Sequence, residues 1–352
     1  METSILAPDE KGLQLASRLL KDGELVAFPT ETVYGLGANA MNADAVRRIF
    51  EAKGRPADNP LIVHVYDRAQ LDEFCTVPPL AEKLMSAFWP GPLTVLCPKK
   101  PCLPDVVTAG LSTVAVRMPS HPVAAAMLRA CALPIAAPSA NRSGRPSPTT
   151  AAHVMQDMDG RIPLILDGGS CDVGLESTVV DVCHGAPTIL RPGGITRDML
   201  EQVLGRVELA PSILSPLKEG EKALSPGMRY RHYAPQGSVT LVDGDEEEVI
   251  AAMKLLAASA RAEGRSCCLL CFDEHEKMLS GLPCHLLGSK AHPEETAHVL
   301  FDVLRSLDDE HMECIYSEVM PPEGVGLAVM NRLGRAASFH RIQACDVLAS
   351  AQ

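Results

Sequence analysis

The chain has 352 residues, 46% hydrophobic and 22% charged, so it is long enough for two domains that each bury a core. Its net charge is −12 and only 4% of its residues are aromatic, which argues against broad binding to nucleic acid. Most of the acidity lies in residues 237–352, with 9 Lys and Arg against 19 Asp and Glu. The nearly neutral first part can therefore still hold a local cationic pocket.

The cysteines predict a reducing compartment. Twelve cysteines are scattered without the spacing of a disulfide framework, and no signal peptide precedes them. The longest apolar stretch, residues 123–138, contains Arg129 and is too short for a membrane span. We therefore expect a cytoplasmic protein without a membrane segment.

The first two hundred residues alternate short apolar runs with helical patterns. The expected strands are residues 24–28, 61–65, 93–97, 114–117, 134–137, 164–166, 177–182 and 188–190. The expected helices are residues 43–53, 80–88, 122–130, 150–158 and 196–204. This mixture, with its several crossovers, predicts an α/β domain over residues 1–207 around a twisted open sheet.

Proline and glycine interrupt the pattern in residues 208–236, which we interpret as a linker. Its last part, residues 225–235, holds two tyrosines, two arginines and a histidine, a dense set for a spacer. Residues 237–352 then alternate again. Strands are expected at 239–242, 266–272, 284–287 and 314–319, and helices at 245–262, 293–307 and 325–336. The order predicts a small Rossmann-like βαβ domain.

Two segments on either side of one expected helix indicate a site for a polyanionic small molecule. Residues 28–37 read Phe-Pro-Thr-Glu-Thr-Val-Tyr-Gly-Leu-Gly, which we interpret as a loop rich in hydroxyls and glycine. Residues 53–60 place Lys53 and Arg55 in a bent segment with Asn59. Hydroxyls, cations and exposed backbone amides suit a nucleotide. Each segment alone could also be an ordinary turn or a solvated loop.

Polar residues also gather at the ends of later strands. In residues 113–117 a strand would place Thr113, Ala115 and Arg117 on one face, with the arginine able to bind a carboxylate. A surface strand with an exposed arginine is the alternative. Residues 136–147 follow an apolar strand and carry several hydroxyls and two cations. Loops at the carboxyl ends of strands are where α/β sheets bind ligands, although a flexible polar loop is the alternative. Residues 176–178 and 189–193 add a hydroxyl pair and Arg191.

Several familiar sites do not fit the sequence. Residues 35–40 match the dinucleotide pattern G-x-G-x-x-A, but six residues separate the glycines from the strand before them. A zinc site could be formed by Cys267, Cys268 and Cys271 with Cys284 and His285 downstream. However, residues 267–271 are a continuous apolar run, which favours a buried strand, and no second Cys-x-x-Cys or histidine pair follows, so we predict no metal ligands. No nucleophile stands beside a base in the sequence. The chemistry is therefore expected to rest on positioning and charge stabilisation.

Four motifs carry a resemblance to a known family: Pro-Thr-Glu-Thr-Val-Tyr-Gly-Leu, Lys-x-Arg-Pro, Ala-Pro-Ser-Ala-Asn and Ser-Thr-Val-Val-Asp. In this order they resemble the YrdC-like family and, within it, the two-domain threonylcarbamoyl-AMP synthases. The resemblance runs from residue 12 to 205 and resumes at 225–235. It implies a nucleotidyltransferase that makes threonylcarbamoyl-adenylate and pyrophosphate from L-threonine, bicarbonate or CO2, and ATP. A partner transferase would then modify tRNA.

The resemblance also implies roles for individual residues. Lys53 and Arg55 would be catalytic. The L-threonine site would consist of Thr32, His64, Arg117, Ala137 and Ser177. The ATP site would consist of Arg55, Asn59, Thr113, Ser139, Ser147, Arg191 and Tyr230. A lid over the pocket would consist of Arg229, His232 and Tyr233.

Cofactor and partner expectations follow from the same resemblance. Mg²⁺ is expected with ATP, held mainly through phosphate oxygens, and no sequence motif marks it. Binding of tRNA is expected to be indirect or weak. Two alternatives stay open: a module that forms carbamoyl-adenylate, although the acylphosphatase and zinc-finger segments of such proteins are missing here, and a binder of double-stranded RNA or tRNA.

Overall fold

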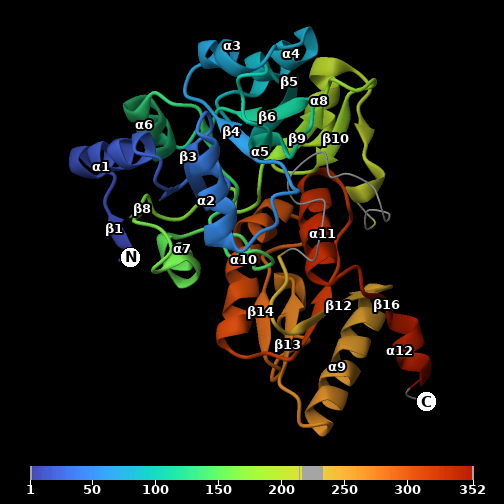
Figure 1. The fold of residues 1–352 in the computed structure, drawn as a ribbon. Coiled ribbons are helices and arrows are strands. Elements are labelled where there is room, and N and C mark those ends of the chain that lie inside the picture. The colour runs from blue at the N-terminus through green and yellow to red at the C-terminus, as the bar shows by residue number, and fades with distance from the viewer. Residues whose placement is uncertain (1, 214, 216–232, 351–352) are drawn as a thin grey trace. The chain divides into compact units, whose positions relative to one another are not determined.

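The computed structural model describes residues 2–213, 215 and 233–350, and the chain divides into two compact units (Figure 1). The first contains Met1–Ser143 and Ser147–Tyr230, and the second contains Gly144–Pro146 and Arg231–Gln352. The predicted linker, residues 208–236, falls largely outside the described residues. The domain boundaries at 207 and 237 therefore stay a prediction.

The first unit is built on an eleven-stranded sheet in the order β1-β8-β2-β3-β7-β4-β6-β5-β9-β10-β11. Its strands are β1 Ser4–Leu6, β2 Val26–Phe28, β3 Gly35–Asn39, β4 Ile62–His64, β5 Leu93–Pro98, β6 Thr113–Arg117, β7 Ile135–Ala136, β8 Leu164–Leu166, β9 Thr178–Asp181, β10 Thr188–Arg191 and β11 Glu208–Leu209. Parallel and antiparallel pairs are mixed: β4 is parallel to β6, whereas β5 is antiparallel to β6. The predicted α/β class and open sheet are confirmed.

The helices of this unit are α1 Glu10–Lys21, α2 Ala43–Lys53, α3 Leu71–Phe74, α4 Pro79–Phe88, α5 Asp105–Thr108, α6 Pro122–Cys131, α7 Ala151–Met158 and α8 Arg197–Leu204. Helix α2 has clear end signals. The Asn42 side chain accepts hydrogen bonds from the first-turn amides, and Gly54 ends the helix at a φ of 61°. These signals place Lys53 at the last position of the helix.

One core of the first unit lies between the sheet and the neighbouring helices α1 and α6 (Figure 1). It contains Leu20 of α1, Phe28 of β2 and Leu128 of α6, all fully buried. Burying a side chain of this size contributes about 1.5–3 kcal/mol. This packing anchors β2, from which the Pro-Thr-Glu-Thr segment leaves.

The glycine-rich segment differs from its predicted conformation. Residues 35–39 form strand β3, antiparallel to β2, rather than a loop. A Cβ atom on Gly37 would lie 2.9 Å from Ile135 and from Phe28, so the close packing of this strand requires glycine. The prediction of a loop throughout residues 28–37 is therefore wrong at its C-terminal end, and only residues 29–34 connect the strands.

The second unit is a five-stranded parallel sheet in the order β14-β13-β15-β12-β16. Its elements are β12 Ser238–Asp243, α9 Glu246–Ala262, β13 Cys267–Cys271, β14 Cys284–Leu286, α10 Pro293–Asp309, β15 Cys314–Glu318, α11 Gly324–Ala336, β16 Arg341–Gln343 and α12 Ala344–Ser350. Helix α9 packs beside α12, and α10 packs beside α11 (Figure 1). The predicted Rossmann-like βαβ pattern is confirmed, with β16 and α12 as additions.

The cysteine-rich run at 267–271 is strand β13, as predicted, but one thiol pair differs from expectation. Cys271 and Cys284 form a disulfide that joins β13 to β14. Leu269 pairs with Cys284 in the strand register, so the two cysteines are diagonal neighbours on one face of the sheet. Sequence spacing could not show this proximity, because it depends on the pairing of the two strands.

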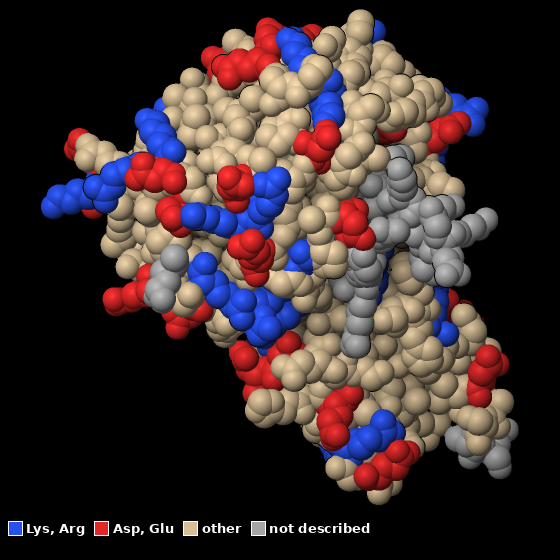
Figure 2. All heavy atoms as spheres, in the orientation of Figure 1, with Lys and Arg blue, Asp and Glu red and all other residues tan. Residues whose placement is uncertain are grey.

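The surface and the helices bear on two further expectations. No described helix has both the length and the apolar character needed to cross a membrane. On the face shown in Figure 2, Lys and Arg side chains of the described residues lie among Asp and Glu side chains instead of forming one broad basic area. That mixture agrees with the net charge of −12.

Candidate functional site

The centre of the candidate site is Arg117, the last residue of β6. The register pairs Arg117 with His64 of β4 on one side and with Thr94 of β5 on the other. Side chains of directly paired residues point to the same face of a sheet. The Arg117, His64 and Thr94 side chains therefore lie together at one end of three adjacent strands.

Arg117 is buried and held by three contacts. Its Nη2 lies 2.7 Å from Glu31 Oε1, its Nη1 donates to Thr32 Oγ1 at 2.9 Å, and its Nε donates to the Gly91 carbonyl at 3.3 Å. The Arg117 and Glu31 side chains are only 4% and 7% exposed, so water hardly screens the ion pair. The guanidinium is thus fixed in orientation before any ligand arrives.

The segment that supplies Glu31 and Thr32 has its own local support. Thr30 Oγ1 accepts from the amides of Thr32 and Val33, both at 3.2 Å, and it donates to the Val33 carbonyl at 2.6 Å. The Thr30 and Thr32 hydroxyls also lie 2.9 Å apart. A threonine at this position stabilises a tight turn. The turn directs Glu31 and Thr32 toward Arg117.

Burial and charge together set the ionisation of the site. Burial acts most strongly and would raise the pKa of Glu31, but the Arg117 charge and the hydrogen bonds to the carboxylate together hold that pKa below its ordinary value. Burial lowers the pKa of His64 to about 3, and the Arg117 charge acts in the same direction. Glu31 is therefore an anion and His64 a neutral imidazole at physiological pH.

The neutral state of His64 predicts a pH-dependent stability. The unfolded-state pKa is about 6.5, so the unfolded chain gains a proton below that pH while folded His64 does not. The His64 contribution is full above pH 6.5 and is lost as pH falls toward 3. Between pH 8 and pH 5 we expect a loss of about 2 kcal/mol from this residue. Urea unfolding of wild type and His64→Gln at both pH values measures it.

The control for this prediction is the same comparison between pH 8 and pH 9, where histidine is neutral in the folded and in the unfolded chain. Over that range His64→Gln and the wild type should change in stability by the same amount. If His64→Gln also matches the wild type between pH 8 and pH 5, His64 does not stay neutral in the folded protein.

A second polar group consists of Thr94 on β5, Ser177 directly before β9, and Arg191 on β10. The hydroxyls of Ser177 and Thr94 are 2.8 Å apart. Arg191 donates from Nη2 to Ser177 Oγ at 3.1 Å and from Nε to the Ser177 carbonyl at 3.0 Å. All three side chains are buried. Since Thr94 pairs with Arg117 across β5 and β6, this group adjoins the Arg117 cluster.

Lys53 joins the end of α2 to the loop after β7. Its Nζ donates to the Ser139 carbonyl at 2.6 Å and also to the Asn141 carbonyl, and Lys53 is only 4% exposed. The Ser143 amide donates to the Lys53 carbonyl at 3.0 Å, so both the side chain and the backbone of Lys53 bind the loop. A buried ammonium with carbonyl acceptors is well placed for an additional anionic ligand.

Arg55 holds the next part of the chain. Its Nη2 donates to the carbonyls of Asn59 at 3.2 Å and Pro60 at 3.3 Å, and its guanidinium lies over the Phe50 ring at 5.9 Å. Asn59 is 1% exposed, and its Oδ1 has no hydrogen-bond partner among the residues that the structure describes. A buried amide oxygen without a donor carries a free-energy cost that a bound ligand could remove.

The remaining predicted residues lie on or beside the same sheet. Thr113 begins β6, on the face that carries Arg117, as predicted. The Ala137 amide donates to the Ile62 carbonyl at 2.9 Å. Ser147 is fully buried and donates to Glu176 Oε1. Thr113 lies four residues before Arg117, about 13 Å along an extended strand, so the site is spread along the sheet.

The predicted lid residues have a different outcome. Arg229, Tyr230 and His232 lie outside the described residues. Tyr233 is described and is 2% exposed in the second unit, where its ring packs on Phe301 with centroids 5.2 Å apart. Arg332 lies over the Tyr233 ring at 5.7 Å. A lid role for these residues stays a prediction.

The comparisons with known proteins fit this architecture. The profile described as "Telomere recombination" (Sua5/YciO/YrdC) matches residues 18–193, and the profile described as "Threonylcarbamoyl-AMP synthase, C-terminal domain" matches residues 195–338. The chain belongs to the Sua5/YciO/YrdC family. It is 47% identical to the threonylcarbamoyl-AMP synthase of Bacillus subtilis over 337 residues, covering 95% of each chain. The predicted family is therefore confirmed.

An archaeal relative supports the same assignment over the whole chain. The threonylcarbamoyl-AMP synthase of Pyrococcus abyssi is 44% identical over 339 residues, which is 95% of this chain and 96% of the relative. A crystal structure titled as P. abyssi Sua5 complexed with L-threonine superposes with a TM-score of 0.90 at 43% identity. It covers 97% of this chain and 98% of that one. The likeness includes both units.

The sequence identified the main residues of the site but not several of the residues that they contact. Glu31 stands inside the Pro-Thr-Glu-Thr motif, but nothing local showed that its carboxylate pairs with Arg117. Thr94 became visible only through the register of β5 with β6. Glu176 was noted beside Ser177, but its hydrogen bond from Ser147 joins positions 29 residues apart. An acidic residue within a hydroxyl-rich motif is the one signal that could have identified Glu31.

Proposed function

We propose that the chain is an L-threonylcarbamoyladenylate synthase, a nucleotidyltransferase. It forms threonylcarbamoyl-AMP and pyrophosphate from L-threonine, bicarbonate or CO2, and ATP, for the N6-threonylcarbamoyladenosine modification of tRNA. The observation that carries the proposal is identity of 41–47% to three proteins named threonylcarbamoyl-AMP synthase over nearly the whole chain. The buried cluster of Arg117 with Thr32 supplies a matching site.

In this proposal the Arg117 cluster binds L-threonine. Arg117 takes the substrate carboxylate, while Glu31 holds the guanidinium in place and Thr32 offers a hydroxyl. Neutral His64 adds no charge that would repel the amine. Ser177 is the further hydroxyl. The Ala137 amide already donates to Ile62, so Ala137 contributes through its carbonyl.

In the proposal, the nucleotide binds to the cationic side chains and hydroxyl groups described above. Lys53 and Arg55 bind the triphosphate, with Asn59 Oδ1 as an acceptor for a ligand hydroxyl or amine. Each charge-assisted hydrogen bond to phosphate contributes roughly 1.5–3 kcal/mol. Thr113, Ser139, Ser147 and Arg191 complete the described part of the site. Tyr230 belongs to the proposal but not to the described residues.

Mg²⁺ is proposed to enter with ATP. The acidic residues near these groups, Glu31 and Glu176, are already held by Arg117 and Ser147. That donor set fits a cation bound mainly through phosphate oxygens and water, as Mg²⁺ prefers, without a dedicated protein cage. When bound, the ion neutralises phosphate charge.

The chain's main task in this reaction is to hold two reactants together. A carbamate on the threonine amine is short-lived in water, so it must be enclosed and held against the α-phosphorus. Orientation of bound reactants accounts for about 7–11 kcal/mol of such a barrier. The buried, pre-oriented Arg117 and the fixed Lys53 fit that task, because neither needs to reorganise during the reaction.

Pyrophosphate release from ATP by the purified chain tests the proposal. Release should require both L-threonine and bicarbonate, and serine and glycine controls define the amine site. ATP binding without threonine-dependent release would favour a carbamoyl-adenylate module. Salt-sensitive RNA binding without that chemistry would favour an RNA binder. The downstream transferase and any direct contact with tRNA are separate parts of the proposal.

A further inference from the structure

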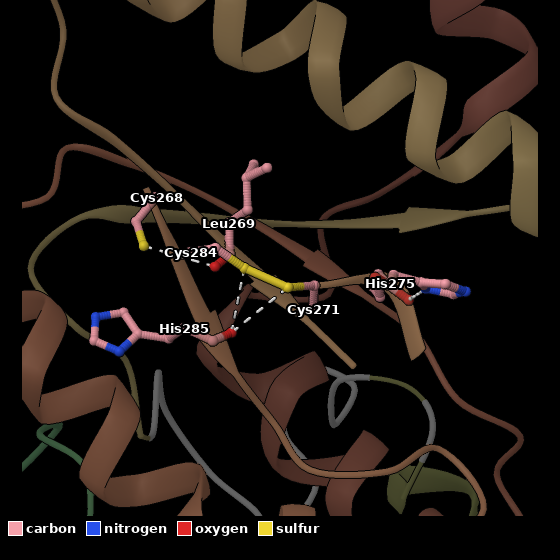
Figure 3. Close-up of a disulfide and its surroundings, with 7 residues drawn as sticks. Cys268, Leu269, Cys271, His275, Cys284 and His285 are labelled. Atoms are coloured by element: carbon pink, nitrogen blue, oxygen red, sulfur yellow. Dashed lines mark hydrogen bonds and ion pairs between the residues drawn. A yellow bond between two sulfur atoms is a disulfide. The ribbon is translucent and has the colours of Figure 1, made fainter. Parts of the chain in front are cut away.

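Three possible metal ligands meet in the second unit, and none of them belongs to the proposed active site. Cys268 lies on β13, His285 on β14, and Glu310 directly after α10. The register pairs His285 with Leu270, and Cys268 lies two residues before Leu270 on the same face. In Figure 3 the Cys268 thiol and the His285 ring lie on the same side of the disulfide.

The three donor atoms are close enough to share one ion. All lie within 4.8 Å of one another, and His285 Nε2 is 2.9 Å and 3.1 Å from the two Glu310 carboxylate oxygens. Tetrahedral zinc with sulfur, nitrogen and oxygen ligands has donors about 3.3–3.6 Å apart. The His285 and Glu310 side chains are 27% and 40% exposed, so they can rotate to bring the donor atoms to these separations and admit an ion.

The charge around the cluster favours a cation. Helix α10 is 17 residues long and ends in Asp308 and Asp309, with Glu310 as its C-cap and no basic residue in its last turn. A helix C-terminus carries partial negative charge and stabilises cations nearby. Cys268 is 1% exposed, and its thiol donates to the Leu269 carbonyl at 3.6 Å and also has a hydrogen bond with the His285 backbone.

We propose that Cys268, His285 and Glu310 form a Zn²⁺ site. Thiolate, imidazole and carboxylate together suit zinc, and three protein ligands leave a fourth position for water. On binding, Zn²⁺ replaces the thiol proton of Cys268, which leaves to solvent. It also takes the place of the Nε2 proton that His285 donates to Glu310, and the neutral imidazole then carries its proton on Nδ1. The ion thereby joins two strands to the end of α10.

The site is separate from the disulfide, and it reverses the sequence-based prediction that this region holds no zinc. Cys267, Cys271 and Cys284 pack against the apolar core that includes α9, whereas Cys268 points to the opposite face of β13. The sequence showed Cys268 and His285 as possible ligands but no second Cys-x-x-Cys or histidine pair to complete a site. The third ligand here is a glutamate 25 residues after His285.

The experiment uses the full chain as purified, with its disulfide intact, titrated with Zn²⁺ and separately with Co²⁺. We expect one ion per chain and, with Co²⁺, the near-ultraviolet charge-transfer band of a thiolate ligand. Cys268→Ser should remove this band. His285→Ala and Glu310→Gln should each weaken binding at least about tenfold, since even changes outside the ligand shell cost 10–100-fold.

Two matched variants control for indirect effects. Cys267→Ser removes the neighbouring thiol from the other face, and His292→Ala removes a histidine that pairs with Glu294 at 3.3 Å. Both should bind as the wild type does. Cys268 is buried, so Cys268→Ser could misfold. In that case Glu310→Gln, at an exposed position, still tests the site. Absence of ion binding, an unchanged band in folded Cys268→Ser, or loss of binding in Cys267→Ser would each overturn the proposal.

Discussion

Arg117→Ala should lower kcat/KM for L-threonine by about 10²–10⁴-fold, because two charge-assisted hydrogen bonds to the substrate carboxylate are lost. The same change should destabilise the fold by about 3–5 kcal/mol, because it leaves the buried Glu31 carboxylate without its partner. Threonine-dependent pyrophosphate release and urea unfolding measure the two effects separately. We expect the loss of activity and the loss of stability each to be larger than for any other single substitution in the site.

The double variant Glu31→Gln with Arg117→Ala separates binding from stability. A neutral amide at position 31 leaves no buried charge, so most of the lost stability should return. Activity should not return, because the amide cannot bind a carboxylate as the guanidinium does. If the double variant regains threonine-dependent turnover, Arg117 acts only by balancing Glu31, and the proposed threonine site is wrong.

Arg55→Ala should keep the fold and lose most adenylate formation. Arg55 is only half-buried, so we expect its removal to destabilise the fold less than the loss of the buried Arg117. Contacts to the triphosphate are expected to strengthen as charge develops during transfer. Two such contacts imply a loss in kcat/KM for ATP of about 10²-fold or more.

The matched control for Arg55 is Arg47→Ala on α2. Arg47 pairs with Asp44 one turn earlier, both side chains are more than half exposed, and no role is proposed for them. That variant should release pyrophosphate at the wild-type rate. Near-wild-type turnover of Arg55→Ala at saturating ATP would remove Arg55 from the mechanism.

The two cations of the Lys-x-Arg-Pro motif differ in what they hold. Lys53 is buried and binds the loop carbonyls of Ser139 and Asn141, so it orders the loop after β7 as well as offering charge. The Arg55 Nη2 donates to the Asn59 and Pro60 carbonyls of its own segment. A variant at Lys53 therefore mixes structural and catalytic effects, which is why Arg55 is the clearer test.

The sequence by itself determined the local elements and the family. Helix α2 was predicted at residues 43–53 and begins and ends there, because Asn42 and Gly54 act within a few residues of its ends. The strand that ends at Arg117 followed from a short apolar run in the same way. The order of four motifs predicted the family, since each motif is read from contiguous residues.

Only the tertiary structure decided which of these residues meet. Thr32 lies 85 positions from Arg117, and Ser177 lies 83 from Thr94, yet both pairs form hydrogen bonds. The same holds for strand β3. Its glycines predicted a loop, but in the structure they pair with β2 and form a strand. Local preferences act over a few residues, whereas sheet register and burial depend on the whole chain. The sequence therefore named the groups of the site, and strand pairing brought them together.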